Sequence, residues 1–171
     1  MEPVPGKQAA ERVKGIINPK FQVHGYAVGL TVRQVFAVDP VGQVDFGGSE
    51  YKAAGRIAVA SLRRDPQDRY EWWDLSRGAY LVEFNETLEL AEDEVGMLEP
   101  EERLLRAGAA HPSLFLRGTV DPVETLLTVE ATRIQIKQNA RTSRLRVFRF
   151  AAQPAPPLPR AAAKKAKKSR R

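Results

Sequence analysis

The chain has 171 residues, 43% of them hydrophobic, and a formal net charge of +6. This size and apolar content are typical of one globular domain, and the absence of cysteine excludes disulfides, thiolate metal sites and thiol nucleophiles. No apolar run has the length of a membrane span, and Met1–Gly6 contains no apolar signal segment, so we expect a cytoplasmic protein with no membrane partner.

The first half of the chain predicts one short helix followed by strands. Lys7–Ile17 is rich in residues that favour a helix, and Asn18-Pro19 ends it. Runs of β-branched and aromatic residues predict strands over Tyr26–Val38, Gln43–Phe46 and Gly55–Leu62. The adjacent Trp72 and Trp73 would face opposite sides of a strand.

The second half predicts short strands with turn residues between them. Their ranges are Ala79–Phe84, Thr87–Leu90, Val95–Leu98, Glu124–Glu130, Thr132–Lys137 and Arg144–Phe150. The one helical segment among them is Glu101–Ala107, with Pro100 just before its start. This pattern predicts an all-β barrel or sandwich with a short N-terminal helix and one short internal helix.

Composition divides the chain into a β domain over residues 1–150, a Pro-rich linker over 151–159 and a basic tail over 160–171. The linker should be extended, and the tail has too few apolar residues to fold. The tail holds seven of the 27 Lys and Arg and no acid, which leaves 20 basic against 21 acidic residues elsewhere. We therefore expect the tail to bind nucleic acid weakly and without sequence preference, or to act only as a solubilising segment.

Five segments resemble, in order and spacing, the superfamily of trimeric dUTP diphosphatases (dUTPases) and dCTP deaminases, most closely its archaeal-type branch. They are Gln22–Val32, Gln43–Phe46, Arg77–Glu86, Leu98–Gly108 and the stretch from Asp121-Pro122 to Asn139-Ala140-Arg141. A generic β protein with coincidental matches explains this order less well. The resemblance implies a dUTPase-like distorted β-barrel or jelly-roll, a homotrimer, a deoxynucleoside triphosphate ligand and Mg²⁺ if the protein is active.

The same resemblance implies a set of site residues. Asp121 stands at the position of the carboxylate that activates water, and Glu130 lies one residue from that of the deaminases' general acid/base. The implied substrate-binding residues are Arg103, Arg106, Asn139, Arg141 and Arg144. Each also has a structural explanation, because Asp before Pro is a common turn pair and exposed arginines or glutamates often only face solvent.

Several of the family's active positions are altered. Gly29 stands where an aspartate helps to hold magnesium, and glycine has no ligand atom. By spacing, Glu101, Glu102 and Arg103 stand where the family's phosphate-binding helix has Arg-Ser-Ser. Two carboxylates at the start of that helix would repel a triphosphate but stabilise the helix itself. The hairpin that reads the base is shortened after Asp121-Pro122, and Arg144 replaces a glutamine.

These features leave three hypotheses. The first is a catalytically degenerate homologue with a nucleotide-binding, regulatory or structural role. The second is an active enzyme, converting dUTP to dUMP and pyrophosphate or deaminating dCTP. The third is a nucleic-acid-associated protein that acts through the tail.

His24 and His111 lie too far apart in sequence to indicate a zinc site.

Overall fold

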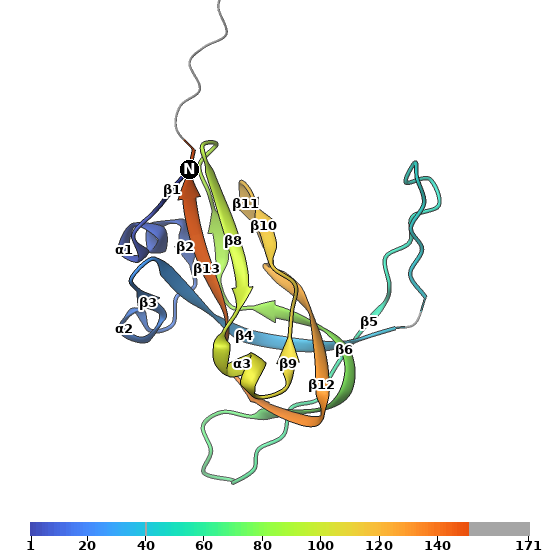
Figure 1. Ribbon diagram of the computed structural model, residues 1–171. Coiled ribbons are helices and arrows are strands. Elements are labelled where there is room, and N and C mark those ends of the chain that lie inside the picture. The colour runs from blue at the N-terminus through green and yellow to red at the C-terminus, as the bar shows by residue number, and fades with distance from the viewer. Residues whose placement is uncertain (40, 151–171) are drawn as a thin grey trace, which may run out of the picture.

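Long strands rich in β-branched and aromatic residues build the body of the protein. The computed structural model describes residues 1–39 and 41–150, so the predicted linker and tail lie outside the described residues. The longest strands are β4 (Ala27–Val38), β6 (Trp72–Phe84), β12 (Glu124–Lys137) and β13 (Arg141–Arg149). They pair antiparallel and curl into a half-barrel (Figure 1), which confirms the predicted all-β fold.

The main sheet has the strand order β10-β8-β13-β4-β6-β12-β9. Its shorter members are β8 (Glu94–Pro100), β9 (Ala109–Ala110) and β10 (Leu114–Leu116). Three more short strands pair with members of this sheet: β1 (Glu2–Pro3) pairs with β13, and β3 (Val23–His24) and β5 (Arg56–Ala58) pair with β4. A second sheet contains β11 (Thr119–Val120), β7 (Thr87–Glu89) and β2 (Val13–Lys14). The helical segments are α1 (Gly6–Ala9), η1 (Ala10–Arg12), α2 (Pro19–Gln22) and α3 (Glu102–Arg106).

The structure differs from the sequence-based elements in several places. The strand predicted over Gly55–Leu62 is shortened to β5. The N-terminal helix ends at Arg12, because the following Val13 pairs with Leu88 of β7. Gln43–Phe46 forms only a single bridge, between Gln43 and Lys52, in a hairpin that projects from the body (Figure 1). The two strands predicted between residues 124 and 137 are one strand, β12, whose register shifts between Val129 and Arg133. Strand β6 begins seven residues before the predicted Ala79.

The core lies inside the curl of the sheet. Alternate residues of β12 point into it, including Leu127 and Val129, as half-buried strands require. Trp73 is buried and donates a hydrogen bond to the carbonyl of Val59 at 3.1 Å, whereas Trp72 is only partly covered. The expected opposite orientation of the two tryptophans is therefore confirmed.

Strand β13 positions the candidate site, because it lies between β4 and β8. Arg144 pairs with Gly29 of β4 on one side and with Glu99 of β8 on the other. The chain leaves β8 and enters α3 next to β13, where the amide of Glu101 donates to the carbonyl of Thr142 at 2.9 Å. None of the helices in the described ranges 1–39 and 41–150 is long and apolar enough to cross a membrane.

Candidate functional site

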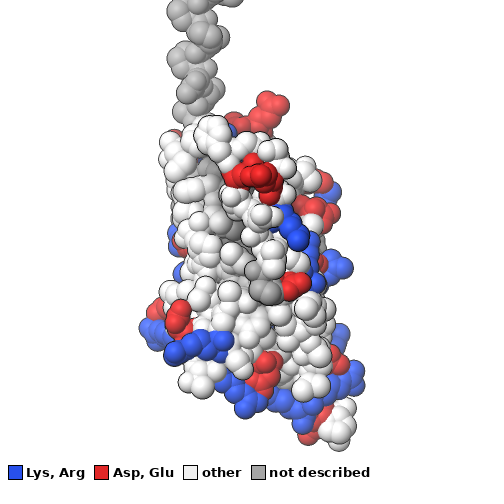
Figure 2. Space-filling view, turned by 90° about the vertical axis from the view of Figure 1, so that its right-hand side faces the viewer, with Lys and Arg blue, Asp and Glu red and all other residues white. Residues whose placement is uncertain are grey.

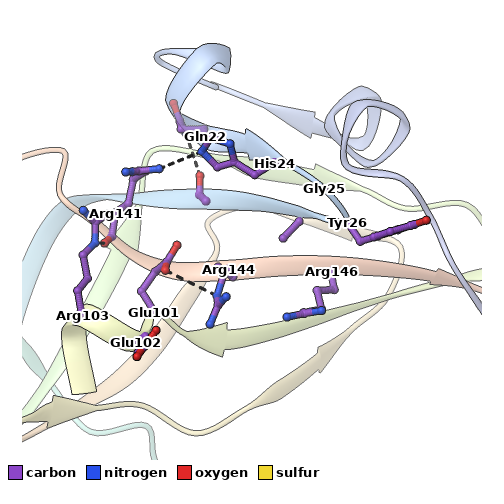
Figure 3. A pocket seen from close by; sticks show the side chains of 12 residues that line it. Gln22, His24, Gly25, Tyr26, Glu101, Glu102, Arg103, Arg141, Arg144 and Arg146 are labelled. Carbon is purple, nitrogen blue, oxygen red and sulfur yellow. Dashed lines mark hydrogen bonds and ion pairs between the residues drawn. The ribbon is translucent and has the colours of Figure 1, made fainter. Parts of the chain in front are cut away.

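A cavity of about 500 Å³ lies between α2 and β3, the start of α3 and the middle of β13 (Figure 3). We call it the arginine pocket. Its charged lining residues are Glu101, Glu102, Arg103, Arg141, Arg144 and Arg146. The structure thus brings together three of the predicted substrate-binding arginines, 103, 141 and 144, from three separate places in the sequence.

A local irregularity of β13 places its arginines on one side. Arg144 and Arg146 are two residues apart, so they share a face of the strand. Arg141 is an odd number of residues from Arg144 and would face the opposite way in a regular strand. The pairing with β4 shifts between Arg141 and Ser143, and such a shift reverses the side on which the preceding residues lie. All three guanidinium groups consequently line the same pocket.

Arg141 and Arg103 are held by backbone carbonyl groups. Arg141 donates from Nη1 to the carbonyl of Phe21 and lies 3.3 Å from His24 Nε2. Arg103 donates from Nε to the carbonyl of Arg141 at 2.9 Å. Burial, and then the nearby charge of Arg141, lower the pKa of Arg103, as expected where like charges are gathered without full compensation.

Arg144 has counter-ions close by but lacks a hydrogen-bond acceptor. Its Nε lies 3.7 Å from Glu101 Oε2 and 3.8 Å from Glu99 Oε1. This Nε is buried, and within the described part of the chain it makes no hydrogen bond. Glu99 accepts its hydrogen bond from Arg146 Nε instead, at 2.8 Å. A buried donor without an acceptor is costly, so the hydrogen bonding of Arg144 is incomplete in this pocket.

The two glutamates of the helix start behave differently. The Glu101 side chain is 19% exposed and points toward Arg144, as Figure 3 shows. The Glu102 side chain is 68% exposed and accepts a hydrogen bond from Arg106 Nη2 at 2.5 Å, one helical turn away. Only one of the two predicted carboxylates is therefore directed at the arginine pocket, and Arg106 is not among the residues that line it.

Three further predicted residues lie outside the arginine pocket. Asp121 lies just before β12, at the opposite end of that strand from Arg141, and Glu130 is an exposed residue of β12. Asn139 lies in the turn from β12 to β13 with a φ of 62°, and its Oδ1 accepts from Asn85 Nδ2 at 2.9 Å. Neither Asp121 nor Glu130 lines the arginine pocket.

Sequence reasoning missed the polar support beneath the pocket. Gln22 donates from Nε2 to the carbonyl of Gly29 at 2.9 Å and to Glu86 Oε1 at 2.7 Å. Glu86 is buried and accepts two more hydrogen bonds from the backbone and hydroxyl of Thr31, at 2.8 and 2.6 Å. Burial raises the pKa of the Glu86 carboxyl. Nothing in the local sequence distinguished these residues, but Arg146 could have been found from its i+2 spacing to Arg144.

The pocket residues do not fit a magnesium ion held by one chain. On β4 the lining residues are Ala27 and Gly29, whose side chains carry no oxygen. The only carboxylates that line the pocket are Glu101 and Glu102, and residues 1–39 and 41–150 contain no cluster of three or more potential ligands among His, Asp and Glu. Magnesium requires several oxygen ligands in octahedral geometry.

Sequence comparisons find relatives that are named deoxyuridine 5'-triphosphate nucleotidohydrolases. The chain is 26% identical over 135 residues to a probable deoxyuridine 5'-triphosphate nucleotidohydrolase of Methanosarcina acetivorans, covering 78% of this chain and 75% of that protein. The corresponding protein of Methanosarcina mazei is 24% identical over the same coverage. The deoxyuridine 5'-triphosphate nucleotidohydrolase of Methanocaldococcus jannaschii is 27% identical over 88 residues, 52% of this chain and 53% of that protein. No family model matches the sequence.

Structural comparison finds a solved structure with a similar fold. The crystal structure of 2'-deoxycytidine 5'-triphosphate deaminase from Agrobacterium tumefaciens matches 85% of this chain with a TM-score of 0.62. The sequence identity is 14%, so the likeness shows the fold alone, and the chain spans about half the length of that protein, 48%.

Proposed function

We propose that this chain is a catalytically degenerate member of the dUTP diphosphatase and dCTP deaminase superfamily that binds the phosphates of a deoxynucleoside triphosphate. The sequence matches and the shared fold support this proposal. The role of the chain is then to bind a nucleotide for a regulatory or structural purpose. The observation that carries this proposal is the buried Nε of Arg144, which lacks a hydrogen-bond acceptor in a pocket lined by three other arginines.

The charge balance of the arginine pocket supports phosphate binding. Four guanidinium groups line it against two carboxylates, and one of these, Glu102, is paired with Arg106. Guanidinium groups bind phosphate oxygens with paired, charge-assisted hydrogen bonds. The carboxylate of Glu101 lies beside Arg144, so a bound triphosphate must displace the interaction between these two side chains.

Two departures support the loss of catalysis. Ala27 and Gly29 offer no oxygen for a metal ion at the β4 side of the pocket. Asp121, Pro122 and Val123 lead directly into β12, without a hairpin that could read a base. Hydrolysis of a triphosphate depends on positioning and on charge neutralisation, and these losses affect both.

The alternative is an active diphosphatase or deaminase. It is favoured by the curated relatives, which are named as deoxyuridine 5'-triphosphate nucleotidohydrolases, and by the presence of Asp121. In this alternative Asp121 would reach the arginine pocket of a neighbouring copy in an assembly, and Mg²⁺ would be held largely by the triphosphate and water.

Turnover assays separate the two functions. We expect no appreciable pyrophosphate release from dUTP and no ammonia release from dCTP, with or without Mg²⁺, while titration calorimetry detects binding of dUTP that Arg144→Ala weakens. Robust Mg²⁺-dependent pyrophosphate release that is lost in Asp121→Asn would establish the active enzyme instead. Deamination lost in Glu130→Gln would equally contradict the proposal.

We further propose that the protein acts as a homotrimer and that residues 160–171 bind nucleic acid weakly. The first follows from the superfamily resemblance and the second from the composition of the tail. Both can be tested independently of the arginine pocket.

A further inference from the structure

A second cavity of about 510 Å³ adjoins the arginine pocket and shares Gln22 and Arg141 with it. We call it the aromatic cavity. Phe21 of α2 and Tyr70, two residues before β6, line it together with Lys137 and Asn139 near the turn from β12 to β13. Its volume is within the range of small-molecule sites in proteins, about 300–1,000 Å³.

We propose that the aromatic cavity holds the nucleobase of the nucleotide whose phosphates occupy the arginine pocket, with the base stacked on Phe21 or Tyr70. This inference rests on the proposed function, because it places the rest of the same ligand. It assigns the base to a site built from one chain, separate from the shortened segment after Asp121.

The position of Phe21 favours a stacking role. Its side chain is 55% exposed, although it belongs to the short helix α2. The backbone beneath it is held on both sides, since its amide donates to the carbonyl of Asn18 at 3.0 Å and its own carbonyl accepts from Arg141. The fold thus presents a large apolar ring to water on a fixed support. A planar base removes such a ring from water by stacking on it.

The cavity also offers unused polar groups for the edge of a base. Among the described residues, the side-chain amides of Asn18 and Gln138 have no hydrogen-bond partner. The hydrogen bond from Asn85 fixes the Oδ1 of Asn139 and leaves its Nδ2 free to donate. A side-chain amide has both donors and acceptors, as the edge of a nucleobase requires.

Arg141 connects the two cavities. Its guanidinium group is held by the carbonyl of Phe21, at the boundary between the exposed ring and the cluster of arginines. A phosphate bound to Arg141 would therefore place the attached sugar next to Gln22 and direct the base toward Phe21. Lys137 adds a positive charge to the lining of the aromatic cavity, 6.0 Å from the ring centre of Tyr70.

The test compares ligands with and without a base on the full chain. Titration calorimetry measures the affinity of dUTP, dCTP and inorganic tripolyphosphate for the wild type, Phe21→Ala, Tyr70→Ala and Arg144→Ala. We expect at least one of the two aromatic variants to weaken nucleotide binding about tenfold without changing tripolyphosphate binding. Arg144→Ala should weaken both kinds of ligand.

Two further variants serve as controls. Phe115→Ala removes an exposed phenylalanine that lies outside both cavities, 69% exposed on β10, and should change neither affinity. Phe21→Trp keeps a stacking surface and should retain nucleotide affinity. Light scattering and thermal unfolding establish that each variant keeps the assembly and fold of the wild type.

The outcomes separate this inference from the proposed function. If Arg144→Ala weakens both ligands but neither aromatic variant affects the nucleotides, the base lies elsewhere and only this inference is wrong. The same conclusion follows if the nucleotides bind no more tightly than tripolyphosphate. It also follows if Phe21→Ala no longer forms the assembly of the wild type, because a second copy of the chain would then cover the ring. If the wild type binds neither dUTP nor tripolyphosphate, both proposals are wrong.

Discussion

The contrast between Glu101 and Glu102 matters most at the scale of single residues. Sequence alone treats them as an equivalent pair of acids at a helix start. In the structure Glu102 is exposed and paired with Arg106, whereas Glu101 lies 3.7 Å from the Nε of Arg144 in the pocket. Glu101 therefore competes directly with any anion for Arg144, and Glu102 does so only weakly through solvent.

Glu101→Gln should therefore raise the affinity for tripolyphosphate and dUTP. Removing one like charge near a bound phosphate gains on the order of 1 kcal/mol, or about fivefold in affinity. Glu102→Gln is the matched control and should have a smaller effect, because its charge is exposed and already paired. Titration calorimetry measures both. An equal gain from the two substitutions would mean that only the net charge of the helix start matters.

Glu101→Gln should not create turnover. The lining residues Ala27 and Gly29 still lack metal ligands, and the segment after Asp121 still lacks a hairpin. Binding and catalysis thus depend on different residues of this site.

At the scale of secondary-structure elements, Glu94 joins three parts of the chain. It lies at the start of β8 with a fully buried side chain and accepts from Arg12 Nε of η1 at 2.8 Å and from Arg149 Nη2 of β13 at 2.7 Å. These hydrogen bonds, first that from Arg12, lower the pKa of Glu94 from 4.5 to about 2. The carboxylate therefore fixes the N-terminal segment and the last strand to the sheet.

Acidification should weaken the ion pairs of Glu94 with Arg12 and Arg149 in a defined pH window. Because the folded-state pKa of Glu94 is depressed, its contribution to stability is complete above about pH 4.5 and is lost as the pH falls toward 2. The contribution is at most about 3 kcal/mol, and less because both arginines are partly exposed. Urea unfolding at pH 7 and pH 3 measures it.

Two variants isolate the contribution of Glu94. Glu94→Gln should be less stable at pH 7 and should lose less stability on acidification than the wild type. Asp93→Asn alters the neighbouring, 53% exposed carboxylate and should keep the pH dependence of the wild type. A Glu94→Gln protein with an unchanged loss of stability between pH 7 and pH 3 would contradict this role.

Local sequence patterns located most strands but could not locate the pocket. The run of β-branched residues gave β4 to within one residue, and Pro100 marked the start of α3. The side on which Arg141 lies depends on a register shift against β4, which is a property of two strands and not of either sequence alone. The predicted helix over Lys7–Ile17 ended early for the same kind of reason, since Val13 pairs with β7.

For the whole molecule, the balance of charge separates the tail from the rest of the chain. On the face shown in Figure 2, acidic side chains lie among the basic ones. Outside residues 160–171 the chain has 20 basic and 21 acidic residues. Long-range attraction to a polyanion must therefore come mainly from the tail.

Removing residues 160–171 should abolish weak binding of DNA or RNA. The binding of the full chain should fall steeply with salt, because seven cations release counterions from phosphates. Fluorescence anisotropy with labelled single- and double-stranded oligonucleotides at several salt concentrations measures it, and circular dichroism confirms the fold of the shortened chain. Nucleic acid retained by the shortened protein at low salt would place the binding surface on the β domain.

The exposed apolar side chains bear on the assembly of the protein. The partly covered Trp72 does not require a partner chain, because the guanidinium group of Arg64 lies over its ring, 3.7 Å from the ring centre. The apolar side chains without cover lie elsewhere, notably Val44 and Phe46 of the projecting hairpin, 91% and 110% exposed (Figure 1). Exposed groups of this size on a projecting segment are typical of contacts between chains.

We therefore expect a homotrimer at micromolar concentration. Closed symmetric assembly would cover such side chains in every copy, and it is the state implied by the superfamily resemblance. Light scattering coupled to size-exclusion chromatography should give three times the 19.0 kDa mass of the full chain. The protein without residues 160–171 should likewise give three times its own, smaller mass. A monomer would contradict this expectation. It would also remove the active-enzyme alternative, because Asp121 could then meet only the pocket of its own chain, from which β12 separates it.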